Sequence, residues 1–414
     1  MRIPRKGMSW DEIAPLLEAV KADDFSWQKG RMAVYFYYLD DALSDVQKKA
    51  YEAFWTENNL GKKAFASLGK LEADVVQFGL DLMQAPADAA GTFTSGGSES
   101  IFLALQTARD WARAEKGIKA PNFVVPRTAH PGFNRAGHAL GIDVRRVPST
   151  RNDFKADVAG MIGAIDADTI GLVGSAPNYP FGVFDPIPEL AAEAKRRGLW
   201  MHVDACVGGF LSPWVKRLGH ALPDWDFAVP GVTSISADLH KHGMAAKGAS
   251  LMLLRSAAIK QQYQTFDFRD WERGPYVAWT MQGTRPGGAV AAAWAVLHHL
   301  GDDGYLRCAR LIMETKVALV DGINRIPGLA VLEPHELAIF VTRAVDPGLD
   351  IGAVSDAMGR RGWFIGRQAE PPGIHMHLNP SHHAVVDEYL HDLRAAVDEA
   401  RNSRAAGSAA GPTY

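Results

Sequence analysis

The feature that most constrains this chain is the alternation, from about residue 93 onward, of short apolar runs with amphipathic ones. Strand-like runs such as "NFVVP" (122–126), "TIGLVGSAP" (169–177) and "LWMHVDA" (199–205) contain few polar residues, and helical patterns such as "IPELAAEAKRRG" (187–198) separate them. Apolar strands joined by helices require a mostly parallel sheet that is covered on both faces. The sequence therefore predicts an α/β fold, with further strands at "DFAV" (226–229), "TSISA" (233–237) and "ASLMLLR" (249–255).

The C-terminal part of the chain follows a different pattern. A long helical run covers 289–326, and "GLAVLE", "LAIFVTR" and "IHMHLN" after it resemble antiparallel strands, with helical segments at 351–362 and 383–401. We therefore predict four parts, which are an N-terminal helical segment (1–60), a large domain (61–288), a smaller C-terminal α+β domain (289–400) and a flexible tail rich in small residues (401–414).

Composition argues against several classes of function. The net charge of −3 provides no basic field that would attract nucleic acid or an anionic membrane. Cys206 and Cys308 are the only cysteines, so no disulfide framework is implied and a reducing compartment is favoured. No run of about 18 apolar residues occurs, and no apolar signal segment precedes the first helix. We expect a cytoplasmic protein with no membrane span, no nucleic-acid partner and no metal site.

Three loops that follow strand-like runs contain groups that could bind one ligand. In "TFTSGGSES" (92–100), two glycines and Ser98 precede a helix. The backbone N–H groups there could hold an anion, or the segment could be an ordinary tight turn. Asp204 ends an apolar run, where open α/β sheets bind ligands and where an aspartate can also simply cap a turn. Lys241 and Lys247 lie in "SADLHKHGMAAKGAS" (236–250), and either alone would most often be a surface lysine.

Together these groups match the needs of one cofactor. Pyridoxal phosphate requires fixed donors for its phosphate, a carboxylate beside its ring nitrogen and an amine that bonds its aldehyde. The glycine-rich turn, Asp204 and Lys241 supply these in chain order. His130 follows another strand-like run and could lie over the ring, or could be a hydrogen-bonded loop residue. The sequence therefore predicts a pyridoxal phosphate site.

From about Gly30 to Arg401 the chain resembles the fold-type-I decarboxylase group of pyridoxal phosphate enzymes, and within it the sphingosine-1-phosphate lyases. The segments that carry this resemblance are "TSGGSESIFLAL", "VVPRTAHPGFNRAG", "GSAPNYPFGVFDPIPELA", "HVDACVGGF", "SISADLHKHGMAAKGASLMLL", "GTRPGGAVAAAWA" and "PPGIHMHL". The resemblance implies a carbon–carbon lyase that cleaves a 2-amino-3-hydroxy substrate, such as a sphingoid base phosphate or a related β-hydroxy amine, to an aldehyde and an amine.

Two alternatives remain open from the sequence. An amino-acid α-decarboxylase would use the same cofactor, but Ser236 in place of an asparagine before "ADLHK" resembles the lyases more closely. A binding protein without turnover is disfavoured, because the chain keeps the lysine, the aspartate and the glycine-rich turn together.

The resemblance also implies roles for individual residues. Lys241 would bond the cofactor, Asp204 would pair with the ring nitrogen, and His130 would stack on one face of the ring with Ala205 on the other. The residues implied to hold the cofactor phosphate are Gly97, Ser98, Ser236 and His240.

Other implied roles concern the substrate and a second subunit. Gly283 and Thr284 resemble a loop that reaches the phosphate of a neighbouring subunit, which implies a homodimer with shared active sites. Lys247 resembles a lysine that binds the substrate's phosphate, and Tyr276 resembles a substrate-side tyrosine. Gly61 replaces a histidine of the lyases, so we expect the substrate phosphate to add little to binding. We expect no counterpart of the family's N-terminal membrane-spanning helix. Segments 30–41 and 265–279 are expected to line the entrance, and His242 is expected to be a packing residue.

Overall fold

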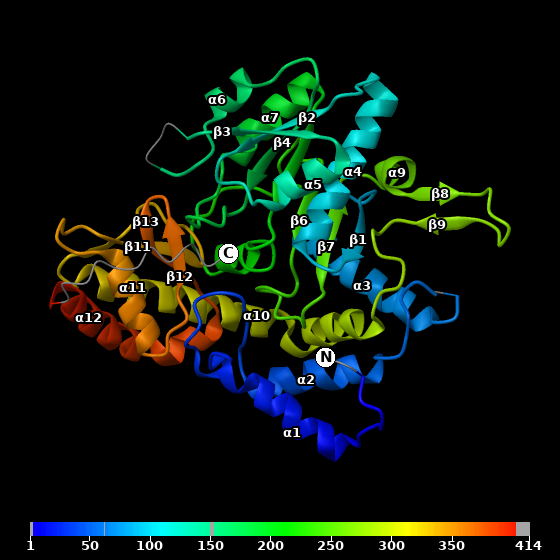
Figure 1. Ribbon diagram of the computed structural model, residues 1–414. Coiled ribbons are helices and arrows are strands. Elements are labelled where there is room, and N and C mark those ends of the chain that lie inside the picture. The colour runs from blue at the N-terminus through cyan, green and yellow to red at the C-terminus, as the bar shows by residue number, and fades with distance from the viewer. Residues whose placement is uncertain (1–2, 62, 150–152, 403–414) are drawn as a thin grey trace.

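A seven-stranded sheet forms the centre of the molecule in the computed structural model, which describes residues 3–61, 63–149 and 153–402. The strand order is β1-β7-β6-β5-β4-β2-β3 (Figure 1). From β6 to β3 all neighbours are parallel, whereas β7 is antiparallel to both β6 and β1. The predicted mostly parallel α/β sheet is therefore confirmed. The strands are β1 (Ala90–Thr94), β2 (Asn122–Pro126), β3 (Asp143–Val147), β4 (Thr169–Ser175), β5 (Trp200–Asp204), β6 (Ser234–Ala237) and β7 (Ser250–Leu254).

Helices cover both faces of this sheet, because alternate strand residues point to opposite sides. Phe123, Ile170 and Met252 pack with α4 and α5 on one face, and Val124, Leu172 and Leu251 pack with α3 and α7 on the other. Helices α4, α5 and α7 each end at a glycine with a φ of 61–67°, a conformation that glycine adopts without strain. The helices are α3 (Ala66–Leu82), α4 (Gly97–Lys116), α5 (Gly132–Leu140), α6 (Val158–Gly163), α7 (Ile187–Arg197), α8 (Ser212–Arg217) and α9 (Ala257–Ile259).

The C-terminal unit is built on a four-stranded antiparallel sheet in the order β10-β11-β13-β12. Figure 1 shows α10 (Gly287–Asn324) running alongside both units, with a non-helical residue at Gly301. The predicted long helix and the three predicted antiparallel strands are thus present. The remaining elements of this unit are β10 (Leu329–Val331), β11 (Ile339–Ala344), α11 (Ile351–Arg360), β12 (Gly366–Ala369), β13 (Pro372–His377), a 3₁₀ segment (Pro380–Val385) and α12 (Val386–Asn402).

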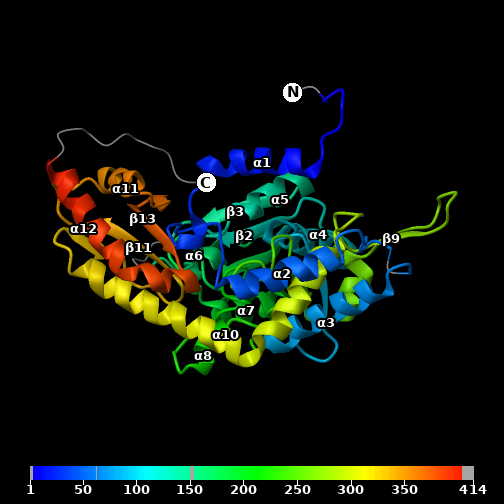
Figure 2. The same ribbon diagram turned by 90° about the horizontal axis from the view of Figure 1, so that it is seen from below.

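Two peripheral elements leave apolar side chains exposed. Helix α1 (Trp10–Val20) buries none of its residues and lies at the outside of the molecule (Figure 2), whereas α2 (Asp41–Ala53) packs against α10. The hairpin of β8 (Phe266–Phe268) and β9 (Tyr276–Ala278) projects from the body, with Phe266, Trp271 and Val277 exposed. Short 3₁₀ or π segments occupy Lys21–Asp23, Trp27–Lys29 and Lys260–Gln264.

One expected strand is wrong. Residues 226–229, "DFAV", form a turn in which Asp226 Oδ1 accepts a hydrogen bond from Ala228 N at 2.9 Å. The carboxylate closes the turn locally, so the apolar residues Phe227 and Val229 are buried without joining the sheet. Strands β3 and β12 and the β8–β9 hairpin were not predicted. The four-part division of the chain stays a prediction, and the part of the predicted tail from residue 403 onward lies outside the described residues. Within the described ranges, no helix is both long enough and apolar enough to cross a membrane.

Candidate active site

The carboxyl ends of five strands meet at one edge of the large sheet. Strands β2, β4, β5 and β6 are parallel, and β1 runs in the same direction as β6 because both are antiparallel to β7. The loops after these strands enclose a cavity of about 410 Å³, which is in the size range of small-molecule sites. Of the residues predicted from the sequence, those that line it are Gly97, Ser98, His130, Asp204, His240, Lys241 and Lys247.

The first turn of α4 forms one wall of the cavity. The N–H groups of Glu99 and Ser100 donate to Gly96 O, which leaves those of Gly97 and Ser98 for an anion, and the helix dipole favours an anion at this end. A Cβ atom on Gly97 would lie 2.8 Å from Cys206 Sγ and 3.0 Å from Asp238 Oδ2, so only glycine fits here without displacement. Glu99 holds the turn in place, because its carboxylate accepts from Ser95 N at 2.7 Å and from Met281 N at 3.0 Å.

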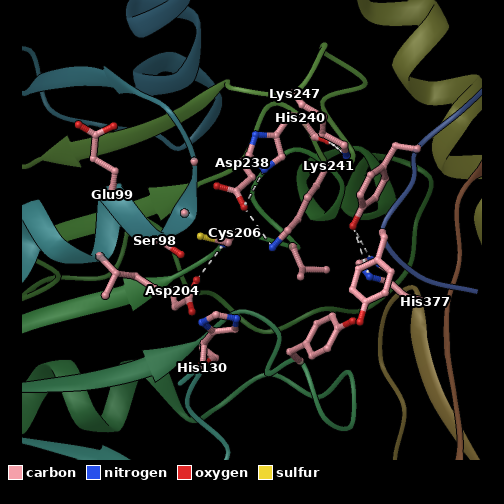
Figure 3. Close-up of a pocket in the computed structure, with 18 of the residues that line it drawn as sticks. Ser98, Glu99, His130, Asp204, Cys206, Asp238, His240, Lys241, Lys247 and His377 are labelled. Atoms are coloured by element: carbon pink, nitrogen blue, oxygen red, sulfur yellow. Dashed lines mark hydrogen bonds and ion pairs between the residues drawn. The ribbon is translucent and has the colours of Figure 1, made fainter. Parts of the chain in front are cut away.

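Asp204, at the end of β5, and His130, in the loop after β2, face the cavity (Figure 3). Asp204 is buried, and its Oδ1 accepts from Cys206 N at 3.1 Å and from Ser236 Oγ at 3.4 Å. His130 Nδ1 accepts from Gly132 N at 3.0 Å, which fixes the ring. Burial lowers the pKa of His130, although the Asp204 carboxylate acts in the opposite direction, so the imidazole is neutral near pH 7.

Lys241 extends from the loop after β6 into the cavity (Figure 3). Its Nζ lies 3.1 Å from Asp238 Oδ2, and His240 Nε2 lies 3.6 Å from the same oxygen. Burial by itself lowers the pKa of Lys241, but the charges around the amine together outweigh burial and raise that pKa well above the ordinary value for lysine, with Asp238 making the largest contribution among them. Asp238 was not singled out from the sequence, although its position three residues before Lys241 was a signal that could have found it.

The wall opposite the α4 turn comes from distant parts of the chain. Tyr35 and Tyr37 precede α2, Tyr179 follows β4, and His377 ends β13. The Tyr37 hydroxyl lies 3.2 Å from His377 Nε2. The expectation that segment 30–41 lines the entrance is consistent with this placement, whereas Tyr179 and His377 were missed. Both lie in segments that carry the family resemblance, but those segments do not show which side chains line a cavity, and His377 reaches it only when the C-terminal unit docks.

Lys247 stands at the mouth of the cavity. Its Nζ donates to His240 O at 3.1 Å and lies 4.8 Å from the centre of the Tyr37 ring, a cation–π distance. Partial desolvation, together with the nearby charge of Lys241, lowers the pKa of Lys247. The ammonium makes no ion pair with a carboxylate among the described residues, so it could receive an anion.

Several predicted residues lie elsewhere. Ala205 and Ser236 are buried beneath the cavity, where the Ser236 hydroxyl also approaches His202 Nε2 at 3.2 Å. Gly283, Thr284, Tyr276 and Gly61 do not line this cavity within their own chain. Thr284 Oγ1 instead accepts from Asn58 Nδ2 at 3.3 Å, and a Cβ on Gly283 would lie 3.8 Å from the Tyr276 hydroxyl. The roles assigned to all these residues stay predictions.

His242 is buried in the loop after β6, directly after Lys241. Its ring nitrogens lie 3.0 Å from Val207 O and 2.9 Å from Leu378 O, so it bridges the large unit and the end of β13. This placement agrees with the packing role that we expected for it.

The residues around the cavity fit pyridoxal phosphate. The α4 turn lines the cavity with the N–H groups of Gly97 and Ser98, which suit a phosphate, and Asp204 is a buried carboxylate that faces the cavity. Lys241 supplies an amine beside a neutral imidazole. Fold and site together define the fold-type-I class of pyridoxal phosphate enzymes.

Comparison with known proteins agrees with this class and narrows it. The model of the pyridoxal-dependent decarboxylase conserved domain matches residues 56–337, and the chain therefore belongs to the pyridoxal-dependent decarboxylase family, whose cofactor is pyridoxal phosphate. It is 37% identical over 404 residues to the sphingosine-1-phosphate lyase of Oryza sativa subsp. japonica, a match that covers 96% of this chain and 74% of that one.

A solved structure and a second relative complete the comparison. The structure of a Burkholderia pseudomallei sphingosine-1-phosphate lyase superimposes with a TM-score of 0.92 at 36% identity, covering 97% of this chain and 93% of that chain. A probable L-aspartate decarboxylase of Pyrococcus abyssi is 32% identical over 408 residues, covering 96% of this chain and 99% of that one. Resemblance to the lyases is thus confirmed, and the decarboxylases are relatives at somewhat lower identity.

Proposed function

We propose that the chain is a pyridoxal phosphate-dependent carbon–carbon lyase that cleaves a phosphorylated 2-amino-3-hydroxy substrate of the sphingoid-base class to an aldehyde and an amine. The observation that carries the proposal is the convergence of the α4 turn, Asp204 and Lys241 on one cavity, in a chain similar to such lyases over nearly its whole length. Two free, buried cysteines support a reducing, cytoplasmic location.

Each residue of the cavity would have a distinct role in this reaction. Bound pyridoxal phosphate supplies an electron sink joined to the substrate's amino group. The N–H groups of the α4 turn would bind phosphate oxygens, and Asp204, held by Cys206 N and Ser236 Oγ, would keep a proton at the ring nitrogen. His130, which is fixed by Gly132 N, would help to hold the ring. Lys247, at the mouth, binds the anionic group of the substrate.

A homodimer is part of this proposal. The exposed Phe266 and Trp271 of the hairpin, and the position of Gly283 and Thr284 outside their own chain's cavity, support a loop that completes the site of a second copy. Such a loop would add phosphate contacts that one chain lacks.

Replacement of Lys241 tests the cofactor assignment. We expect Lys241→Ala to abolish the visible absorbance of the lysine-bound cofactor and to lower kcat/KM by about a thousandfold or more, because no other amine has the same place in the site. Lys48→Ala, which removes an exposed lysine on α2, is the matched control and should leave both unchanged. Retention of the absorbance in Lys241→Ala would contradict the assignment.

Product analysis tests the reaction. Incubation with a phosphorylated β-hydroxy amine should release an aldehyde without carbon dioxide, whereas carbon dioxide from an amino acid would favour the decarboxylase instead.

The same assay with the dephosphorylated substrate tests the expectation that, with Gly61 in place of a histidine, the substrate phosphate adds little to binding. We expect kcat/KM to fall by less than about a thousandfold, which corresponds to about 4 kcal/mol, because this chain lacks a histidine there.

A further inference from the structure

Asp238 is a buried carboxylate in direct contact with the amine of the site. It follows the last residue of β6, is 2% exposed, and turns its side chain into the cavity (Figure 3). Its Oδ2 lies 3.1 Å from Lys241 Nζ, and its Oδ1 has no hydrogen-bond partner among the described residues. Neither phosphate binding nor the pairing of Asp204 with the ring nitrogen explains a second carboxylate at this position.

We propose that Asp238 is a positioning residue that holds Lys241 as an ammonium before the cofactor binds and receives it again whenever the substrate's amine displaces it. The proposal rests on the function proposed above and assigns Asp238 a part in it. The lysine is thereby kept in one place and in one protonation state whenever it is not bonded to the cofactor.

The physical reason is the cost of an isolated charge away from water. An ammonium that leaves water without a partner loses its proton instead, because burial disfavours the charged form. The Lys241 side chain is 24% exposed, and Asp238 provides the compensating charge at ion-pair distance. Among the described residues, Asp238 is the carboxylate that forms an ion pair with Lys241.

Other groups around the pair contribute less than Asp238. The Asp204 carboxylate also raises the pKa of Lys241, but less than Asp238 does, and among the described residues it forms no ion pair with the ammonium. Burial lowers the pKa of His130 and of His240, so both rings are neutral near pH 7. Burial also raises the pKa of the Cys206 thiol well above its ordinary value, so the thiol carries no charge. The titratable groups that face the pair from the surrounding elements are Tyr37, His130, Asp204, Cys206, His240, His242, Lys247 and His377.

The consequence concerns cofactor loading. An ammonium cannot attack an aldehyde, so Lys241 must first release its proton to solvent. The bond between Nζ and the aldehyde carbon then forms, and the aldehyde oxygen leaves as water. The loading rate should therefore rise with pH up to the pKa of Lys241, and Asp238 should set the pH at which this rise ends.

The test measures loading and does not depend on turnover. Pyridoxal phosphate is added to cofactor-free protein over a range of pH, and the growth of the visible absorbance gives the rate. In Asp238→Asn, the midpoint of the pH profile should fall by about one unit or more, so loading at lower pH becomes about tenfold faster. Borohydride reduction and mass spectrometry should place the adduct on Lys241 in both proteins.

Asp45→Asn is the matched control. Asp45 is an exposed carboxylate on α2 that pairs with Lys48 outside the cavity, so its replacement should leave the pH midpoint unchanged. Equal midpoints in wild type and Asp238→Asn would overturn the inference, as would an equal shift in Asp45→Asn. If the wild type forms no absorbing species at any pH, the proposed function itself fails, which separates the two ideas.

A measurement on the unaltered chain covers the case in which Asp238→Asn does not fold. Cofactor-free wild type is labelled with a small amine-specific reagent across pH, and labelling of Lys241 is compared with labelling of Lys247. We expect Lys247 to become reactive at the lower pH, because its ammonium forms no ion pair with a carboxylate of the described residues and burial lowers its pKa. The reverse order would overturn the inference.

Discussion

At the scale of the residue, the site depends on side chains that have little room to vary. Gly97 is enclosed by Cys206 and Asp238, and Asp204 is held by two hydrogen bonds. The α4 turn, which would bind the phosphate, and the Asp204 carboxylate therefore pack together through Cys206. The addition of a single methyl group should therefore change the affinity for the cofactor.

Gly97→Ala should weaken cofactor binding with little change in overall folding. The new Cβ would lie 2.8 Å from Cys206 Sγ, so the α4 turn must shift and lose at least one charge-assisted hydrogen bond, which corresponds to a roughly tenfold to hundredfold higher Kd. Equilibrium titration with pyridoxal phosphate measures this. Gly163→Ala, at a position with nothing within 4 Å of the new Cβ, is the control. An unchanged Kd in Gly97→Ala would refute the packing argument.

At the scale of the element, α10 joins the two units and packs along α2. Close packing at this contact requires a glycine, because Gly288 lies directly against Tyr51. A Cβ on Gly288 would lie 2.6 Å from Tyr51 Cδ1 and 2.7 Å from Tyr51 O. Because the second contact is with backbone, a rotamer change of Tyr51 cannot relieve it.

Gly288→Ala should therefore destabilise the protein by about 1–3 kcal/mol, as overpacking of a filled interface does. The free energy of unfolding from urea denaturation is the measurement. Gly359→Ala on α11 adds a methyl group in open space, so it should be neutral or stabilise by up to about 1 kcal/mol through helix propensity. If both variants lost the same stability, the close contact with α2 would not be the cause.

At the scale of the whole molecule, the exposed hairpin and the loop at Gly283 favour a pair of chains that share their sites. The proposal predicts that two inactive variants complement each other. Lys241→Ala lacks the amine, and Gly283→Asp would place a negative charge against the phosphate of the neighbouring site. A mixed dimer contains one site with neither change.

Mixing the two variants after reversible dissociation should restore roughly one quarter of wild-type activity, because half of the dimers are mixed and each has one intact site. Activity and sedimentation velocity are measured on the same samples. Lys48→Ala mixed with Lys241→Ala controls for simple dilution. No gain from the first mixture, in samples shown to exchange subunits, would argue against shared sites.

Much of the site could be predicted because its central residues follow strands that the sequence marks clearly. Asp204 ends β5, and Lys241 follows β6 by four residues, so the parallel sheet brings both to one edge. The turn at 226–229 was mistaken for a strand because four residues carry too little periodicity to distinguish a buried turn from a strand. Asp238 was overlooked although it lies three residues before Lys241, because that spacing indicates closeness along the chain and not the direction of the side chain.

The sequence by itself determined the α/β class, the pyridoxal phosphate chemistry and the residues that follow each strand, because periodicity and local motifs are short-range properties. Only the tertiary structure decided that Tyr37, Tyr179 and His377 share a wall of the cavity, that Asp238 contacts Lys241, and that Gly283 lies outside its own chain's site. These contacts join residues whose distance is set by the docking of separate units and by side-chain packing, which depend on the whole fold.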